Sequence, residues 1–342
     1  MTQIATIGLD LAKNVFQVHA AAADGTPIFS RKLRRGEVLQ FFSKIAPCLV
    51  GLEACGGAHY WAREIGAAGH DVRMMPPSYV KPFVKRGKTD AADAEAISEA
   101  VTRKTMRFVP AKSAEQQADA VVLRTRALLV GQRTQAINAL RAHLAEFGII
   151  TGTGKEKVAA LFTIIDDEAD ARLPAAARFA LRQLARQIEG LADQIRTIEK
   201  AIVAASRRND MARRLATIPG VGAVTAAAIL AFVPDPAGFK SGRHFAAWLG
   251  LTPRSHSSGG KERLGRISKM GNRMLRSLLF VGATAVLRHA RNNPKAPQWI
   301  TALLARRPYK VAAVALANKM ARIIRALLVK DESYRGLSAA QA

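Results

Sequence analysis

The chain has 342 residues, which is long enough for two or three domains with sizeable hydrophobic cores. Hydrophobic residues make up 49% of it, which excludes a disordered chain, and an aromatic content of only 6% favours helices packed through small residues over a large β-sandwich. A formal net charge of +26 repels itself in the free protein and predicts a polyanionic partner.

The first eighty residues predict a mixed β-sheet. Alternating apolar residues mark the strands, Asp24-Gly25 is a hairpin turn, and Pro76-Pro77 ends the sheet. The expected strands are residues 4–10, 15–21, 27–33, 48–53 and 71–75, with a helix at 59–68. Three antiparallel strands followed by β-α-β is the element order of a ribonuclease H-like α/β domain, so the order predicts that fold.

From Asp90 onward the pattern becomes helical. We expect one helix over Ala91–Lys104 and a long one over Ser113–Gly148, followed by a linker to Gly154. Apolar residues then alternate spacings of three and four, which predicts a coiled-coil seam. The seam residues are Leu181, Leu184, Ile188, Leu191, Ile195, Ile198 and Ile202. Their partner is either the preceding long helix or another subunit, and an ordinary amphipathic core helix is the alternative.

A third segment begins near Met211 and is mainly helical to about residue 330. We therefore expect a metal-dependent catalytic domain at 1–150, a coiled-coil segment at 151–208 and a C-terminal domain at 209–342. Two cysteines, Cys48 and Cys55, give no disulfide framework, which fits a reducing cytoplasm. The sequence shows no signal peptide, and its longest apolar run, Leu278–Leu287, is too short to span a bilayer.

The positive charge is concentrated in the C-terminal part of the chain. Residues 207–342 hold 24 Lys and Arg against 5 Asp and Glu, a net charge of +19, whereas the first 206 residues carry only +7. Such a distribution is typical of nucleic-acid binding, and a solvated basic surface is the alternative.

Four carboxylates are candidate metal ligands. Asp10 ends the first strand and Glu53 ends the fourth, which are neighbours in a ribonuclease H-like sheet, while Asp90 and Asp93 share one helical face. Oxygen ligands suit Mg²⁺ or Mn²⁺, and two such ions can support phosphoryl transfer. Singly, Asp10 could be a turn residue and Asp90 a helix cap. Lys88 is expected to lie near this site and to contact phosphate.

Ile218-Pro-Gly-Val-Gly resembles the turn of a helix-hairpin-helix. In that element the backbone N–H groups beside Gly220 and Gly222 would contact a phosphate at a helix N-terminus. The alternative is a plain connection between two helices without a ligand.

The segment from Gly250 to Arg276 combines hydroxyls with a flexible Gly259-Gly260 pair. From Arg254 to Arg276 the chain has seven basic residues and only one acid, Glu262. Such a loop can present a nucleophilic serine to a phosphodiester, while the bases stabilise the developing charge. Residue chemistry alone favours the alternative, a flexible loop that only binds phosphate, because His256 is the only nearby candidate base for a serine. The basic candidates for nucleic-acid contact are Arg254, Lys261, Arg263, Arg266, Lys269 and Arg273.

Taken together, these motifs resemble the DEDD transposases of insertion sequence family one-ten, also described as bridge-RNA-guided serine recombinases. The matching motifs run in the family's order over nearly the whole chain. They are GLD with Asp10, LEACGG with Glu53, KTDAADAEAI with Asp90 and Asp93, IPGVG at 218–222, and FAAWLGLTPRSHSSGGKERLGRISKMGN at 245–272.

The resemblance implies a RuvC-like N-terminal domain, a coiled-coil insertion and a C-terminal transposase domain. It implies Asp10, Glu53, Asp90 and Asp93 as catalytic metal ligands for Mg²⁺ or Mn²⁺. It also implies that Ser258 attacks DNA to form a phosphoserine linkage, beside the metal site of another subunit.

The resemblance further implies donor and target DNA, a structured guide RNA and a homo-oligomer, from dimer to tetramer, as partners. We accordingly expect a cytoplasmic, nucleoid-associated recombinase that moves its own insertion sequence. A metal-dependent Holliday-junction resolvase that hydrolyses with water and a non-catalytic nucleic-acid-binding protein are the alternatives.

Overall fold

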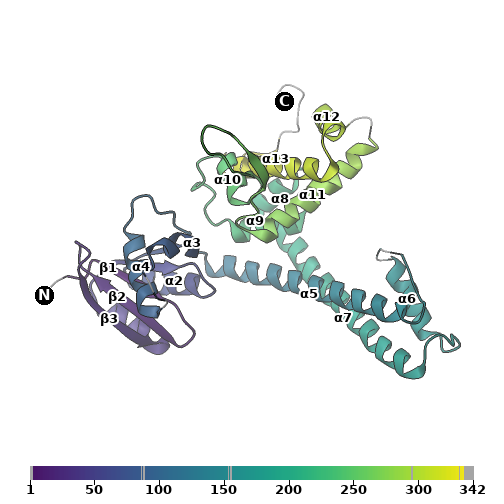
Figure 1. Cartoon of the computed structure of the whole chain (residues 1–342), viewed down its shortest axis with the longest axis horizontal. Helices are drawn as coiled ribbons and strands as arrows, with labels where there is room; N and C mark the ends of the chain where they lie inside the picture. The colour runs from purple at the N-terminus through teal and green to yellow at the C-terminus, as the bar shows by residue number, and fades with distance from the viewer. Residues whose placement is uncertain are drawn as a thin grey trace. The chain divides into compact units, whose positions relative to one another are not determined.

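The computed structural model describes residues 3–85, 87, 89–152, 154, 156–293, 296–330 and 332–334. By its internal contacts the chain divides into two compact units, Met1–Gln117 and Ala118–Ala342. Figure 1 labels the helices and strands of both units.

The N-terminal unit contains the predicted five-stranded mixed sheet, in the order β3-β2-β1-β4-β5. Strands β1, β2 and β3 pair antiparallel, whereas β4 pairs parallel to both β1 and β5. The strands are β1 (Thr6–Asp10), β2 (Val15–Ala21), β3 (Pro27–Arg34), β4 (Leu49–Glu53) and β5 (Asp71–Met75). The ribonuclease H-like order expected from the sequence is confirmed.

The two faces of this sheet are covered by different helices. Ile7 and Leu9 are buried in one core with Phe42 of helix α1 (Val38–Ser43) and Ile65 of helix α2 (Ala58–Ala67). Because side chains alternate along a strand, the residues between them face the other side, where helix α4 (Asp90–Val101) packs on β1, β2 and β4.

Four short elements add to the predicted ones: η1 (Arg35–Glu37), α1, α3 (Pro77–Val80) and η2 (Lys81–Phe83). Each has six residues or fewer, which is too short for helical periodicity to be detected in a sequence. Pro77 stands in the first turn of α3, where a proline is tolerated because its missing N–H is not needed.

Figure 1 shows two long helices, α5 (Ala114–Ala145) and α7 (Ala175–Arg208). Both helices contribute residues to the same hydrophobic clusters. Leu140 of α5 lies in one buried cluster with Ile188 of α7, and Leu123 lies in another with Ile202. Helix α6 (Glu156–Asp166), which the sequence did not reveal, joins the first cluster and packs on α7. Of the predicted seam residues, Leu181 and Ile188 lie in the cluster with α5 and α6, and Ile202 lies in the cluster with Leu123 of α5.

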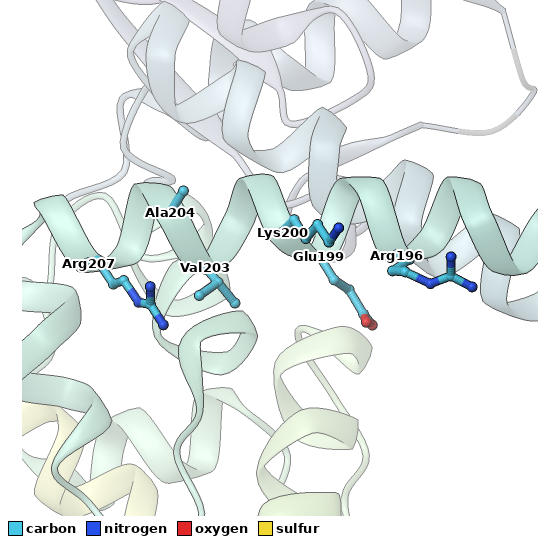
Figure 2. Close-up of a pocket in the computed structure, with 6 residues that line it drawn as sticks. All are labelled: Arg196, Glu199, Lys200, Val203, Ala204 and Arg207. Atoms are coloured by element: carbon cyan, nitrogen blue, oxygen red, sulfur yellow. The ribbon is translucent and has the colours of Figure 1, made fainter.

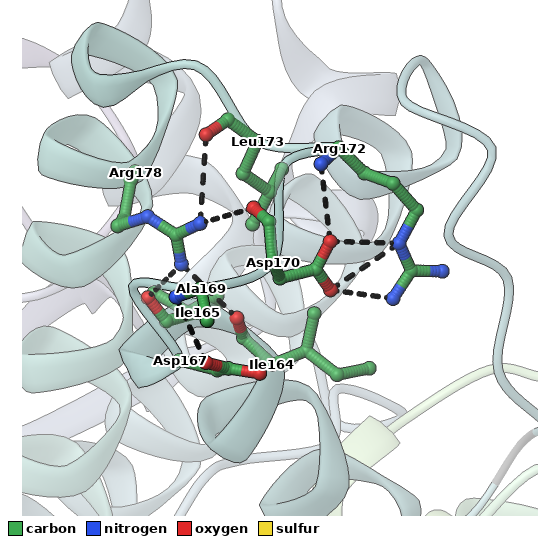
Figure 3. A network of polar contacts seen from close by, with 8 residues as sticks. All are labelled: Ile164, Ile165, Asp167, Ala169, Asp170, Arg172, Leu173 and Arg178. Carbon is green, nitrogen blue, oxygen red and sulfur yellow. Dashed lines mark hydrogen bonds and ion pairs between the residues drawn. The ribbon is translucent and has the colours of Figure 1, made fainter.

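A buried arginine fixes the connection between α6 and α7 (Figure 3). The guanidinium of Arg178 donates hydrogen bonds to the carbonyl oxygens of Ile165, at 2.8 Å, and Asp170, at 2.7 Å. It is only 6% exposed, so the carbonyls at the end of α6 and in the following loop replace its lost water.

The rest of this unit is mainly helical, as predicted. Its buried core includes Phe245, Leu279 and Leu316. The helices are α8 (Asp210–Ala216), α9 (Ala223–Phe232), α10 (Gly242–Trp248), α11 (Arg273–Arg291), α12 (Gln298–Arg306) and α13 (Tyr309–Lys330). No helix within the described ranges is both long and apolar enough to cross a lipid bilayer.

The Gly/Ser-rich segment expected as a flexible loop is instead an antiparallel hairpin of β6 (Pro253–Ser255) and β7 (Leu264–Ile267). The alternation that identifies a strand was missing because neither strand has a buried face: all three residues of β6 are exposed, as are three of the four in β7. The hairpin is held together by its backbone hydrogen bonds.

Candidate active site

Asp10 and Glu53 stand at the same edge of the sheet. They end β1 and β4, which are parallel neighbours with Leu9 opposite Leu52. Alternation places both carboxylates on the face that α4 covers, because the apolar Leu9 and Leu52 project to the opposite face. Both side chains are half-buried.

Two glycines allow α4 to lie unusually close to this face. Gly8 and Gly51 are directly opposite each other in the β1–β4 register. A Cβ atom on Gly8 would lie 2.0 Å from the carbonyl oxygen of Ala94, and one on Gly51 would lie 2.9 Å from Cβ of Val101. The helix therefore runs over the bare backbone of both strands, with its N-terminal turn toward the strand ends that carry Asp10 and Glu53.

The first turn of α4 supplies the other two acids. Thr89 caps the helix, since its hydroxyl oxygen accepts a hydrogen bond from the N–H of Ala92 at 3.2 Å. Asp90 and Asp93 follow in that turn, where the positive end of the helix dipole favours negative charge.

Neighbouring negative charges influence the ionisation of Asp10 and Glu53. The pKa of Asp10 is raised to about 6, first by burial and then by the negative charges of Asp93, Asp90 and Glu53. Burial, followed by the charge of Asp93, also raises the pKa of Glu53. Asp93, Asp90 and Glu53 are thus near enough to Asp10 for their charges to act on it.

Ser258 lies at the tip of the β6–β7 hairpin. Its carbonyl oxygen accepts a hydrogen bond from the N–H of Lys261 at 3.1 Å, and Gly259 and Gly260 between them have φ of +56° and +75°. Two successive left-handed residues make this tight turn favourable only for glycine. The turn leaves Ser258 exposed.

The neighbouring hydroxyls are engaged within the hairpin, unlike that of Ser258. Ser257 Oγ lies 2.8 Å from Ser255 Oγ and accepts a hydrogen bond from the N–H of Arg263 at 3.2 Å. In the part of the chain that the structure describes, the Ser258 hydroxyl has no hydrogen-bond partner. The imidazole of His256 lies against Gly265, where an added Cβ would be 3.0 Å from Nε2.

Two family models match the chain over the regions that contain these residues. A model described as "Transposase" for DEDD proteins of the IS110 type matches residues 7–149, and one described as "Transposase IS116/IS110/IS902 family" matches residues 212–298. The chain belongs to this transposase family. It is therefore an enzyme of DNA strand cleavage and rejoining.

Relatives resemble it along nearly their whole length. A Sinorhizobium fredii protein named as a transposase is 47% identical over 97% of this chain and 86% of its own. A "probable family 20 transposase" of Pseudomonas aeruginosa is 48% identical over 97% of this chain and 99% of its own. The transposase for insertion sequence element IS1111A of Coxiella burnetii is 40% identical, over 98% and 92%.

The donor set of the transposase suits a hard divalent cation. Four carboxylates supply oxygen ligands only, and their mutual repulsion is what a bound cation would offset. Among the described residues, no three His, Cys, Asp or Glu side chains are arranged to hold one ion as they stand. Asp10, Glu53, Asp90 and Asp93 are the residues that would hold such a metal.

Gln17 is a neighbour of this site that the sequence did not reveal. It is directly opposite Asp10 in the β1–β2 register, so it shares the face of Asp10. Its side chain is 5% exposed and donates a hydrogen bond to Ser30 Oγ at 2.9 Å. The sequence did offer a hint of this role, because Gln17 is a polar residue among the apolar residues of a predicted strand.

The predicted nucleic-acid contacts are distributed around the hairpin. Lys261, Arg263 and Arg266 are exposed on it. The guanidinium of Arg254 donates to the carbonyl oxygen of Ser268 at 3.0 Å, and thereby supports the hairpin base. Lys269 follows with a φ of +55°, Arg273 begins α11, and Lys88 lies outside the described residues.

The Ile218–Gly222 turn connects α8 to α9, as a helix-hairpin-helix would. Gly220 has a φ of +83°, and a Cβ there would lie 2.7 Å from the carbonyl oxygen of Gly282 in α11. Its small size thus serves helix packing. Gly222 is the N-cap residue of α9 and is exposed.

Proposed function

We propose that this transposase recombines DNA through a covalent serine intermediate, with the four carboxylates as a Mg²⁺ or Mn²⁺ site. The observation that carries the proposal is the setting of Asp10, whose pKa is raised to about 6 by burial and then by the negative charges of Asp93, Asp90 and Glu53. Such an arrangement costs stability unless a cation is bound, and it is typical of a functional site.

In the first step Ser258 Oγ attacks a phosphorus atom of the DNA backbone. A P–O bond forms to the serine, the P–O bond to one strand end breaks, and the departing oxygen takes up a proton, while the serine loses its own. The phosphodiester energy is retained in the phosphoserine. A hydroxyl of another strand end then attacks the same phosphorus, releases Ser258 and completes the exchange.

The residues of the chain have separate roles in this scheme. The exposed hairpin tip lets Ser258 reach a duplex, and Lys261, Arg263 and Arg266 would stabilise the negative charge that develops on the phosphoryl oxygens. A divalent cation, when bound, would lower the pKa of a coordinated oxygen and balance charge. We further propose that the acids of one subunit serve Ser258 of another in a dimer or tetramer.

The same proposal includes a structured guide RNA as a partner that pairs with donor and target DNA. Base pairing would then select the sites, and the protein would need only backbone contacts. Its support is the +19 charge of residues 207–342, which favours polyanionic partners.

Covalent trapping tests the mechanism. Full-length protein is incubated with guide RNA, Mg²⁺ and a suicide DNA substrate, and a protein–DNA adduct is sought on a denaturing gel. We expect the adduct with wild type and with Ser257→Ala, whose hydroxyl serves the hairpin, but not with Ser258→Ala. Persistence of the adduct in Ser258→Ala would reject that serine. Metal-dependent nicking without any adduct would favour hydrolysis by water.

A further inference from the structure

Helix α7 has a hollow of about 390 Å³ on its surface (Figure 2). Every residue that lines it comes from α7 itself, from the half of the helix that leads to α8. The lining residues are Arg196, Glu199, Lys200, Val203, Ala204 and Arg207. None of them is among the residues that the sequence singled out.

Three of these residues are exposed cations. Arg196, Lys200 and Arg207 are spaced by four and seven residues, which places them along one side of a helix. At a rise of about 1.5 Å per residue, they are spaced by about 6 Å and about 10.5 Å along the helix axis. They form a row of positive charge about 16 Å long.

The nearby carboxylates do not neutralise the whole row. Glu199 is bound by the guanidinium of Arg126, whose Nε lies 2.9 Å from Oε1, and Asp193 pairs with Arg196 at 2.9 Å. Within the described residues, Lys200 and Arg207 have no ion pair. Two unpaired cations therefore remain on either side of the small side chains Val203 and Ala204.

We propose that this hollow is a docking surface for the phosphate backbone of duplex DNA. The cations match a polyanion, and the positive charge continues beyond the hollow, since residues 196–214 contain six Lys or Arg and two Asp or Glu. The lining has no aromatic side chain on which unpaired bases could stack, so a duplex fits better than a single strand. DNA is the substrate of the family.

The contact is independent of the serine mechanism. Cations that meet phosphates hold a duplex without reading its sequence. Binding without cleavage therefore tests the docking surface even if Ser258 is not the nucleophile.

Binding is measured by fluorescence anisotropy with the full-length chain, a 30-base-pair duplex of arbitrary sequence, and EDTA to prevent cleavage. The test variant is Lys200→Gln/Arg207→Gln. The matched control is Lys157→Gln/Arg186→Gln, which removes the same charge from exposed positions of α6 and α7 outside the hollow.

We expect the test variant to bind about tenfold or more weakly near 0.15 M salt. Losing two phosphate contacts should reduce the slope of log K against log salt by about 1.8. The control variant should keep the wild-type slope. Equal losses in both variants, or an unchanged slope in the test variant, would overturn the proposal. A loss confined to an RNA stem of equal length would replace DNA by RNA as the occupant.

Discussion

Asp10 is a half-buried acid with three carboxylates as neighbours, and its pKa of about 6 lies well above its ordinary value of 3.8. A raised pKa means that the folded protein holds this proton more tightly than the unfolded chain does. Between about pH 4 and pH 6 the folded state therefore binds more protons, and its stability falls as the pH rises through that window. Above pH 6 the charged Asp10 is a constant cost to the metal-free protein.

Replacing Asp10 by asparagine should remove this cost. In EDTA, we expect Asp10→Asn to be more stable than wild type at pH 7 by about 1–2 kcal/mol, the value of the pKa shift after allowance for solvent screening. Below pH 4 the difference should vanish. Thermal unfolding followed by circular dichroism from pH 3.5 to 7.5 measures it, and parallel curves for the two proteins would contradict the expectation. Strand cleavage should be lost in the same variant.

The four acids were predictable because local features of the sequence encode their positions. Asp10 and Glu53 each end a run of strand-forming residues, and Asp90 and Asp93 have helical spacing. Gln17 was not predictable as their neighbour, because its place beside Asp10 depends on the β1–β2 register, to which both strands contribute. Ser258 could be identified only by resemblance to a family, since an exposed serine in a glycine turn has no distinguishing chemistry.

At the scale of elements, the sheet and long helices were predictable from periodicity, but the contacts that set their spacing were not. Gly8 and Gly51 are ordinary strand residues in the sequence, yet together they determine how closely α4 approaches the sheet. Gly220 and Gly282 similarly bring a turn against α11. Each pair is formed by residues distant in the chain, and no local pattern marks them. The β6–β7 hairpin was missed for a different reason, because it buries no side chains.

Adding one methyl group at Gly8 tests the role of this close approach. A Cβ there would lie 2.0 Å from the Ala94 carbonyl oxygen and 2.5 Å from the Ser98 nitrogen, so α4 would have to move. We expect Gly8→Ala to lower the free energy of unfolding by about 3 kcal/mol, at the upper end of overpacking effects. Urea unfolding measures this loss. Gly36→Ala, with nothing within 4 Å of the new Cβ, should change stability little.

The same variant, Gly8→Ala, also tests the geometry of the acids. Displacing α4 carries Asp90 and Asp93 away from Asp10, which should weaken Mn²⁺ binding at pH 7 more than Gly36→Ala does. Isothermal titration in the folded range of the variant measures the affinity. Equal Mn²⁺ affinity in the two variants would show that the glycine pair serves packing and not the site.

For the whole molecule, the dominant feature is a charge of +26 on a chain whose described ion pairs are mostly exposed. Exposed pairs contribute at most about 1 kcal/mol each, and added salt weakens them. Salt also weakens the repulsion among the excess cations, and that effect has the opposite sign. Because positive charges outnumber negative ones two to one, relief of repulsion should dominate in the free protein.

The thermal midpoint of the free protein should therefore rise with salt. Between 0.01 M and 0.15 M NaCl the screening length falls from about 30 Å to about 8 Å, which removes most long-range repulsion. We expect an increase of a few degrees, since about 1 kcal/mol shifts the midpoint of a domain this size by about 2–4 °C. With saturating duplex DNA the thermal midpoint should instead fall as salt is added, because bound DNA stabilises the folded state and salt weakens its binding. A free protein whose midpoint falls with salt would mean that its ion pairs outweigh its excess charge, and would remove the electrostatic reason for a polyanionic partner.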